Sequence, residues 1–226
     1  MPIRKHPIFL DQIYHVYNRG VSLEQIFKDK RDYQRFANLV NFYRYSSPSL
    51  RYSYYNRLPQ KSRELFLEEL EKNNQKHVAV YVFSLMPNHF HFILKEIVES
   101  GIIKFLSNLQ NSYAKYFNTK TKRKGSLFLE MFKAVRIESD EQFIHTARYI
   151  HLNPTTSYLV KGVNELKNYQ WSSLKNYLEG EGWPFVQTDF LRNFFSSKEA
   201  LESFTFDQID YQRKLEEIKH LVRDLQ

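Results

Sequence analysis

The chain of 226 residues contains no cysteine, which excludes a disulfide framework, a thiolate metal site and a cysteine nucleophile. A composition without cysteine suits the reducing cytoplasm, where we expect the protein to reside. No apolar run approaches the ~18 residues that a bilayer-spanning helix needs, and the polar start MPIRKHPIFLDQ lacks the apolar core of a signal peptide. We therefore expect no membrane partner.

Glycine is also scarce. Six glycines occur, and none forms the GxGxxG or Walker pattern that cradles phosphates, which argues against a nucleotide-binding enzyme. The hydrophobic share of 42% is enough for one good core, or for a core with a smaller appendage. Lys and Arg number 33 against 25 Asp and Glu, a formal charge of +8. Such an excess is expected of a nucleic-acid binder, but many basic proteins bind no nucleic acid, so charge alone does not decide the function.

Periodic apolar residues predict an ordered series of strands and helices. Residues 13–19 (IYHVYNR) alternate and are rich in β-formers, and apolar residues recur on one helical face across 32–45. The later elements are a strand at 78–85, a turn at 86–88, a returning strand at 89–95, a helix from 102 to 116, a strand at 131–137, and a helix that begins after Ser139 and stops near Pro154. This order predicts an α+β fold, a ferredoxin-like split βαβ antiparallel sheet with helices on its faces.

Two regions lie outside this predicted core. Residues 46–76 interrupt the helical pattern with Ser and Pro and then form a short acidic helix, so we interpret them as an insertion. Residues 161–226 are predicted to be a mostly helical C-terminal extension to a domain at 1–160. That extension ends in a charged helix near 208–225.

The stretch MPNHFHFILK, residues 86–95, places two histidines one residue apart at the start of the returning strand. Side chains alternate across a strand, so His89 and His91 share one face while Phe90 and Phe92 face the opposite layer. Two imidazoles on one face are able to converge on a metal ion. An isolated pair of this kind more often caps a hairpin or packs at a sheet edge, and that alternative stays open at this point.

A second cluster, ARYIHLNP at 147–154, places Tyr149 and Asn153 one helical turn apart on the same face. We expect the first and third strands to be parallel neighbours and the fourth to run antiparallel beside the first. The fourth strand would then end at the edge where His89 and His91 begin the third. The helix that follows would bring a phenol and an amide toward the two imidazoles. The alternative is that Tyr149 is a core aromatic and Asn153 a helix stop.

Four ordered motifs resemble those of a known family. MPNHFHFIL, YHVYNRG (14–20), GSLFLEMFKA (125–134) and RYIHLNP (148–154) resemble the single-tyrosine HUH transposases of the IS200-like transposase family, and within it the REP-associated tyrosine transposases. The resemblance covers residues 8–175 and follows the family's order and approximate spacing. It implies that residues 1–160 are a catalytic domain of the HUH endonuclease type.

The resemblance also implies a chemistry. His89, His91 and Asn153 would hold one divalent ion, Mg²⁺ or Mn²⁺, beside the scissile phosphate of single-stranded DNA. Tyr149 would be the nucleophile that forms a 5′-phosphotyrosine, which makes Tyr149, His89, His91 and Asn153 the implied catalytic set. Another 3′-hydroxyl would then rejoin strands without ATP. The implied target is a hairpin or an imperfect palindrome.

Basic residues with aromatic neighbours that can stack on unpaired bases are the expected DNA contacts: Arg19, Lys115, Lys120, Lys122, Arg123 and Lys124. The alternative for the basic run at 120–124 is a solvated loop. Two other functions stay open, a domesticated DNA-binding protein without catalysis and a metal phosphoesterase that uses a water. Both a monomer and a homodimer are compatible with the sequence, and the short connection 137–140 favours a Tyr149 that serves its own chain's site.

Overall fold

The computed structural model describes residues 7–46, 48–73 and 76–209. Its centre is a four-stranded sheet of β1 (Ile13–Arg19), β2 (Val78–Met86), β3 (His89–Glu96) and β4 (Lys133–Ile137), in the order β2-β3-β1-β4. Every neighbouring pair of strands is antiparallel. The predicted α+β fold with a split βαβ antiparallel sheet is therefore confirmed.

One detail of the expected topology is wrong. We expected β1 and β3 to be parallel, but they pair antiparallel, with Arg19 opposite His89. The crossover after β1 returns β2 in the direction of β1, and the tight turn at 87–88 then reverses the chain, so β3 runs against both of its neighbours. The fourth strand consequently ends beside the start of β1, where Ile137 pairs with Ile13. The end of β4 and His89 therefore lie at opposite ends of the strands.

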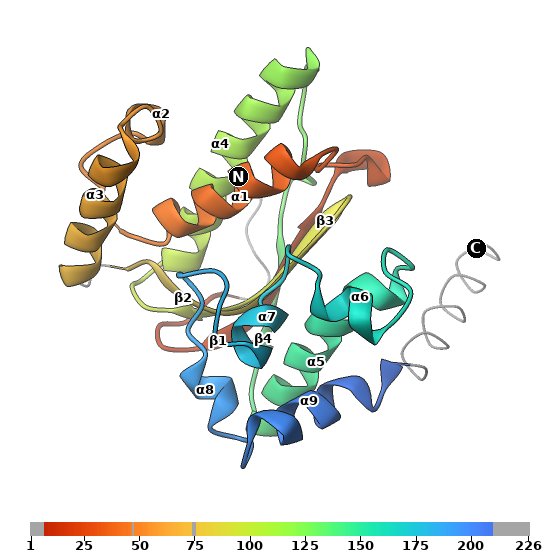
Figure 1. Ribbon diagram of the computed structural model, residues 1–226. Coiled ribbons are helices and arrows are strands. Elements are labelled where there is room, and N and C mark those ends of the chain that lie inside the picture. The colour runs from red at the N-terminus through yellow and green to blue at the C-terminus, as the bar shows by residue number, and fades with distance from the viewer. Residues whose placement is uncertain (1–6, 47, 74–75, 210–226) are drawn as a thin grey trace.

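Helices cover both faces of the sheet. Figure 1 shows α1 (Lys30–Tyr43) and α4 (Gly101–Thr121) on one side and α5 (Asp140–Thr156) on the other. Side chains of β3 point alternately to the two faces of the sheet. Phe90 and Phe92 belong to the core under α1 and α4, and Ile93 belongs to the core under α5. A β-bulge at Val80/Val82 shifts the pairing of β2 with β3.

The helix α5 starts at the predicted cap. The hydroxyl of Ser139 accepts a hydrogen bond from the Gln142 backbone N–H at 3.1 Å, and the Gln142 side-chain oxygen accepts one from the Glu138 N–H at 2.8 Å. The helix runs through Pro154 and ends at Thr156. It begins three residues after β4 ends and returns across the sheet, which brings its second half back toward the opposite edge.

The segment 46–76 leaves and rejoins the core at one place. It contains α2 (Tyr52–Tyr55) and the predicted acidic helix, α3 (Gln60–Lys72), and a bridge between Tyr45 and Lys76 closes its base. The Glu71 carboxylate accepts hydrogen bonds from Arg44 Nη2 at 2.9 Å and Tyr45 Oη at 2.7 Å, and also pairs with Lys76. The base of this segment is thus held by an ionic cluster.

The C-terminal extension is helical, as predicted, and packs on the β2 edge and on the α5 face of the sheet. It contains α6 (Val163–Lys167), α7 (Leu174–Leu178), α8 (Asp189–Arg192) and α9 (Lys198–Phe206). Backbone hydrogen bonds join it to β2, from Leu85 N to Trp171 O at 2.8 Å and from Gln187 N to Val80 O at 2.9 Å. The charged helix predicted near 208–225 lies almost entirely outside the described residues. Among the helices that the structure describes, none is long and apolar enough to span a membrane.

Candidate active site

The two central strands and α5 bring five polar or aromatic side chains to one face of the sheet. On β1, His15 and Tyr17 face α5, because the intervening Val16 points into the opposite core. On β3, His91 lies directly across from Tyr17 in the ladder, and His89 precedes it on the same face. Tyr149 comes from α5 and lies against this face.

The rings of this cluster are in contact distance of one another. The ring centre of His91 lies 5.0 Å from that of His89 and 5.8 Å from that of Tyr149, with both pairs nearly perpendicular. His15 is 6.2 Å from Tyr149 and 5.1 Å from His91, also between ring centres. The three predicted residues His89, His91 and Tyr149 therefore lie together. Tyr149 reaches the histidines because α5 runs back across the sheet from the end of β4.

The imidazoles of His91 and His89 each form a hydrogen bond through Nδ1. His91 Nδ1 lies 2.9 Å from His15 Nε2, and His89 Nδ1 lies 2.6 Å from the side-chain oxygen of Asn88. Burial lowers the pKa of His15 to about 4. Burial also lowers the pKa of His91 well below its ordinary value, with further lowering from the charges of His89 and His15. Both rings are neutral at physiological pH, which is the form that binds metal ions.

The site is reachable from solvent. His91 is buried, whereas His89 and Tyr149 are only half-buried. A phosphate of an extended strand is therefore able to approach the phenol and the outer imidazole without a prior opening of the core.

Asn153 lies one turn beyond Tyr149 on α5 and is buried. Its side-chain oxygen accepts a hydrogen bond from the Ser157 hydroxyl at 3.1 Å, and a carbonyl oxygen has a second lone pair for another partner. Among the described residues, no group of three or more His, Cys, Asp or Glu side chains is arranged to hold a metal ion. The predicted ligands are thus the imidazoles of His89 and His91 with the Asn153 amide as the third, a donor set that suits a divalent ion such as Mn²⁺.

The sequence analysis missed His15 and Asn88. The alternation of IYHVYNR already placed His15 and Tyr17 on one face, and Asn88 directly precedes the histidine pair. What the sequence did not give was the antiparallel register that sets His15 diagonally across from His91.

Comparison with known proteins bears on this arrangement. Residues 47–153 match the family model described as "Transposase IS200 like". This segment of the chain is similar to the IS200-like transposase family. The matched range includes most of the segment 46–76 that we interpreted as an insertion outside the predicted core, and it ends at Asn153. No curated protein matches the chain.

One solved structure similar to this chain is that of a REP-associated tyrosine transposase bound to a REP hairpin. The two chains are 13% identical, the alignment covers 87% of this chain and 95% of the other, and the TM-score is 0.49.

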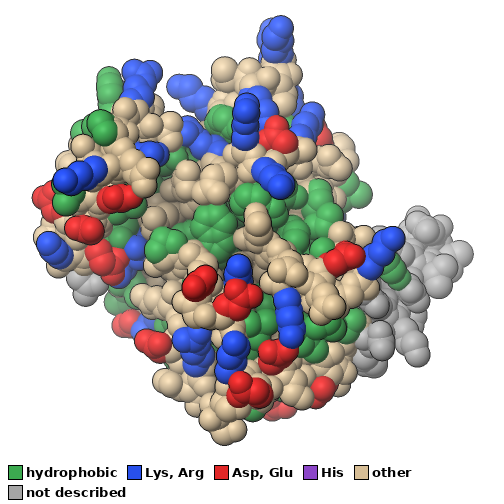
Figure 2. All heavy atoms as spheres, in the orientation of Figure 1, with side chains coloured by type: hydrophobic (Ala, Val, Ile, Leu, Met, Phe, Trp, Pro, Cys, Tyr) green, Lys and Arg blue, Asp and Glu red, His purple; other side chains and the backbone are tan. Residues whose placement is uncertain are grey.

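The predicted DNA contacts fall into two groups. Lys120 pairs with Asp29 at 2.8 Å and with the buried Asp32 at 2.5 Å, and Arg123 pairs with Glu24 at 2.9 Å. The other four are exposed and form no ion pair within the described part of the chain: Arg19, Lys115, Lys122 and Lys124. Figure 2 shows Lys and Arg side chains gathered around the projecting end of α4.

A basic and aromatic hollow of about 790 Å³ lies between α1, residues 48–53 and α4. The Arg35 guanidinium lies over the Tyr52 ring at 4.4 Å and near the Tyr116 ring at 5.2 Å. Lys115 and Arg51 also line the hollow, and no acidic side chain does. This surface is on the far side of the sheet from Tyr149, because α1 and α4 cover the opposite core.

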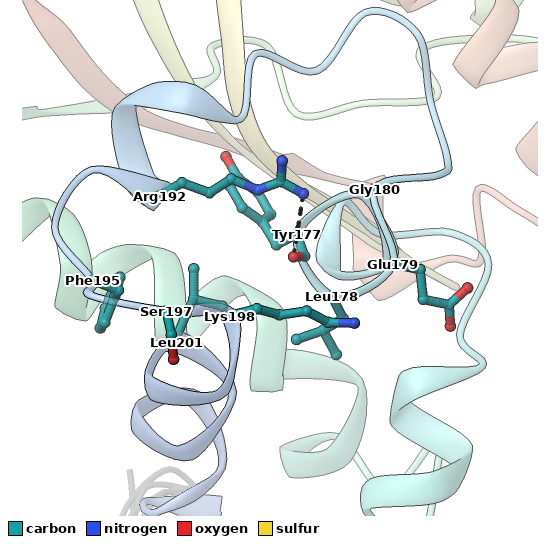
Figure 3. Close-up of a pocket in the computed structure, with 9 residues that line it drawn as sticks. All are labelled: Tyr177, Leu178, Glu179, Gly180, Arg192, Phe195, Ser197, Lys198 and Leu201. Atoms are coloured by element: carbon teal, nitrogen blue, oxygen red, sulfur yellow. Dashed lines mark hydrogen bonds between the residues drawn. The ribbon is translucent and has the colours of Figure 1, made fainter.

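A second pocket of about 420 Å³ lies in the C-terminal extension (Figure 3). Arg192 crosses it and donates hydrogen bonds to the backbone oxygens of Asn176 at 2.7 Å and Tyr177 at 3.4 Å. Neither hollow includes His89, His91 or Tyr149. The candidate active site instead lies between the central strands and α5, where His89 and Tyr149 are half-buried.

Proposed function

We propose that this protein is an IS200-like transposase, a metal-dependent single-stranded DNA endonuclease and strand transferase that acts through a 5′-phosphotyrosine at Tyr149. The observation that carries the proposal is the contact of the Tyr149 ring with His91, beside the half-buried His89, on one sheet face. A phenol beside two imidazoles supplies a nucleophile and two candidate metal ligands within one small site.

The covalent step exchanges one phosphoester for another. The phenol oxygen of Tyr149 forms a bond to phosphorus while the bond from phosphorus to the leaving 3′-oxygen breaks. The phenol gives up its proton to solvent, which reaches the half-buried side chain, and the departing oxygen takes one up as a 3′-hydroxyl. A second 3′-hydroxyl reverses these bond changes and joins a new strand, so neither ATP nor water is consumed.

His89, His91 and Asn153 are the residues that would hold the divalent ion, Mg²⁺ or Mn²⁺. When bound there, the ion supplies positive charge that polarises a phosphoryl oxygen and helps to orient the phosphate for in-line attack. A tyrosine near its free pKa of ~10 is a weak nucleophile, so this charge is needed to stabilise the transition state.

We propose a hairpin or imperfect palindrome with a single-stranded flank as the substrate. The charge of the chain supports this, as do the exposed Arg19, Lys115, Lys122 and Lys124. The similar solved protein was bound to a REP hairpin. Aromatic side chains around the hollow beside α4 offer stacking surfaces for unpaired bases.

The test uses hairpin DNA with a single-stranded flank, labelled at its 3′ end, and Mn²⁺ or Mg²⁺. A 5′-phosphotyrosine keeps that label on the protein, so a labelled adduct that survives denaturant is expected. DNA binding without an adduct would instead indicate a protein without catalysis, and cleavage without an adduct would indicate attack by water.

The matched variants are Tyr149→Phe and His89→Ala. The first deletes one oxygen, so folding and DNA binding should stay near wild type while the adduct disappears at every metal concentration. The second weakens metal binding, so excess Mn²⁺ should restore part of the adduct. An adduct formed by Tyr149→Phe would show that another residue is the nucleophile and would refute the assignment.

A further inference from the structure

The hollow between α1, residues 48–53 and α4 contains an arginine with no acceptor for its donors. The Arg35 guanidinium lies over the Tyr52 ring at 4.4 Å and near the Tyr116 ring at 5.2 Å. It forms no hydrogen bond or ion pair within the described part of the chain, and its Nε is buried without a partner. Two aromatic rings thus hold a planar cation whose terminal nitrogens are available to a ligand.

The charge of the hollow specifies an anionic ligand. Arg51 and Lys115 line it together with Arg35, and both are exposed and form no ion pair within the described residues. Lys120 also lines the hollow, but Asp29 and Asp32 already match its charge. No acidic side chain lines the hollow. Two guanidinium groups and an ammonium group therefore surround one space, and this combination suits a phosphate group.

One face of α4 adds neutral polar groups to these cations. The α4 residues that line the hollow recur every three or four positions, apart from two adjacent pairs, and so lie on one side of the helix. They are Asn108, Asn111, Ser112, Lys115, Tyr116 and Thr119. Amide and hydroxyl side chains both donate and accept hydrogen bonds, as the edges of a nucleobase do.

An aromatic side chain completes the hollow on the α1 side. Tyr43, the last residue of α1, is half-buried, and its ring centre lies 6.2 Å from that of Tyr52. Aromatic rings stack on unpaired bases of any sequence. The volume of about 790 Å³ is in the range of pockets that hold an organic ligand, so the space suits more than an inorganic ion.

We propose that this hollow binds one unpaired nucleotide of a single-stranded DNA segment, with Arg35, Arg51 and Lys115 around its phosphate and Tyr43 against its base. That the strand is DNA rests on the proposed function. Figure 1 shows α2 and α3 on one side of α1 and α4 on the other. Because Tyr149 lies across the sheet from α1 and α4, the bound nucleotide is remote from the scissile phosphate.

The affinity of the full-length protein for a fluorescently labelled oligothymidylate, measured by anisotropy without divalent metal, tests the phosphate contacts. Arg35→Gln and Arg51→Gln should each weaken binding at least about 10-fold, the usual effect of losing a hydrogen bond to a charged group. Arg51 is exposed, so its replacement leaves the fold intact. Wild-type affinity in both variants would overturn the proposal.

The matched control is Arg57→Gln, because Arg57 is exposed in the same segment but does not line the hollow. Its affinity should equal that of the wild-type protein. An equal loss in Arg57→Gln and Arg51→Gln would show that only net charge matters, and would overturn the assignment of a site.

Photocrosslinking locates the base. An oligonucleotide that carries 5-iododeoxyuridine is irradiated on the protein, and the modified peptide is identified by mass spectrometry. We expect attachment at Tyr43, and Tyr43→Leu should weaken binding at least about 5-fold, as expected for a lost stacking contact. Crosslinks confined to the Tyr149 face of the sheet would overturn the proposal.

Competition identifies the source of the phosphate. Thymidine monophosphate and inorganic phosphate should displace the oligonucleotide only at concentrations far above that of the oligonucleotide itself. Displacement by the mononucleotide at equal concentration would indicate a site for a free nucleotide, and equal displacement by polyglutamate would indicate an acidic polypeptide partner. Either result would overturn the assignment to a DNA strand.

These measurements fail or succeed separately from the adduct assay on Tyr149. An adduct without a crosslink at the hollow would refute the nucleotide site and leave the proposed function standing. A crosslink at Tyr43 without any adduct would refute the catalytic proposal and support the nucleotide site.

Discussion

The salt dependence of DNA binding separates lysines that are available to phosphates from cations that the protein already uses. Lys115, Lys122 and Lys124 are exposed and form no ion pair within the described part of the chain, whereas Arg123 pairs with Glu24 at 2.9 Å. The perturbation is the triple variant Lys115→Gln, Lys122→Asn and Lys124→Gln. Asparagine is chosen at 122 because this residue has a positive φ of 54°, which asparagine tolerates better than most residues.

The magnitude follows from counterion release. Each phosphate neutralised on single-stranded DNA contributes about 0.7 to the slope of log affinity against log salt, so three contacts contribute about 2. Between about 50 and about 200 mM salt, the wild-type protein should therefore lose about 15- to 20-fold more affinity than the triple variant loses. Fluorescence anisotropy of a labelled single strand, without divalent metal so that no cleavage occurs, measures both slopes.

The control is Arg123→Gln, which removes a cation whose charge is already matched by Glu24. We expect its slope to stay close to that of the wild-type protein. Parallel slopes for the triple variant and the wild type would assign the three lysines to solvent. A large slope change in Arg123→Gln would refute the reasoning that an internal ion pair withholds a charge from DNA.

Three further predictions concern the stability and assembly of the protein. Burial lowers the pKa of His151 from 6.5 to about 3. Its neutral form therefore stabilises the fold fully above pH 6.5, and this contribution is lost as pH decreases toward 3. The thermal unfolding temperature of His151→Phe should depend less on pH in this window. Burial opposes ionisation of Glu71, but hydrogen bonds and charges from Lys76, Tyr45 and Arg44 lower its pKa to about 2. The free energy of unfolding should therefore decrease as pH falls from 4.5 to 2, and it should decrease less in Glu71→Gln. Mixing Tyr149→Phe with His89→Ala should not restore cleavage, because the nucleophile and the histidines meet within one chain; recovered cleavage would show that two chains share a site.

The local elements were predictable because each has a strong pattern of its own. The strand at 13–19 has the predicted bounds, and the histidine pair starts β3 as expected from the turn at Pro87. The relative direction of β1 and β3 was not predictable in this way, because alternation specifies which residues share a face but not which way a neighbouring strand runs. The proximity of Tyr149 to His91 was therefore expected for a partly wrong reason.

Pairing between distant side chains was the other missing part. Nothing in the run KTKRK distinguishes Lys120, which is held by Asp29 and Asp32, from Lys124, which is exposed. The hydrogen bond between His15 and His91 likewise depends on a register between segments 76 residues apart. Such contacts are set by tertiary packing, so a local sequence pattern carries no information on them.

The hydrogen bonds between β2 and the C-terminal extension bear on how short a soluble version of this protein can be. A strand at the rim of a sheet is a template for pairing with another molecule unless something covers it. Here residues 171–173 and 186–187 cover β2, and leucines of α7 and α9 fill the core that α5 shares with the sheet. A chain shortened to residue 160 would keep Tyr149 and both histidines but would expose this rim and its apolar neighbours. The part of the C-terminal extension that covers β2 thus protects the sheet from self-association, and its loss should yield aggregates instead of a smaller folded protein.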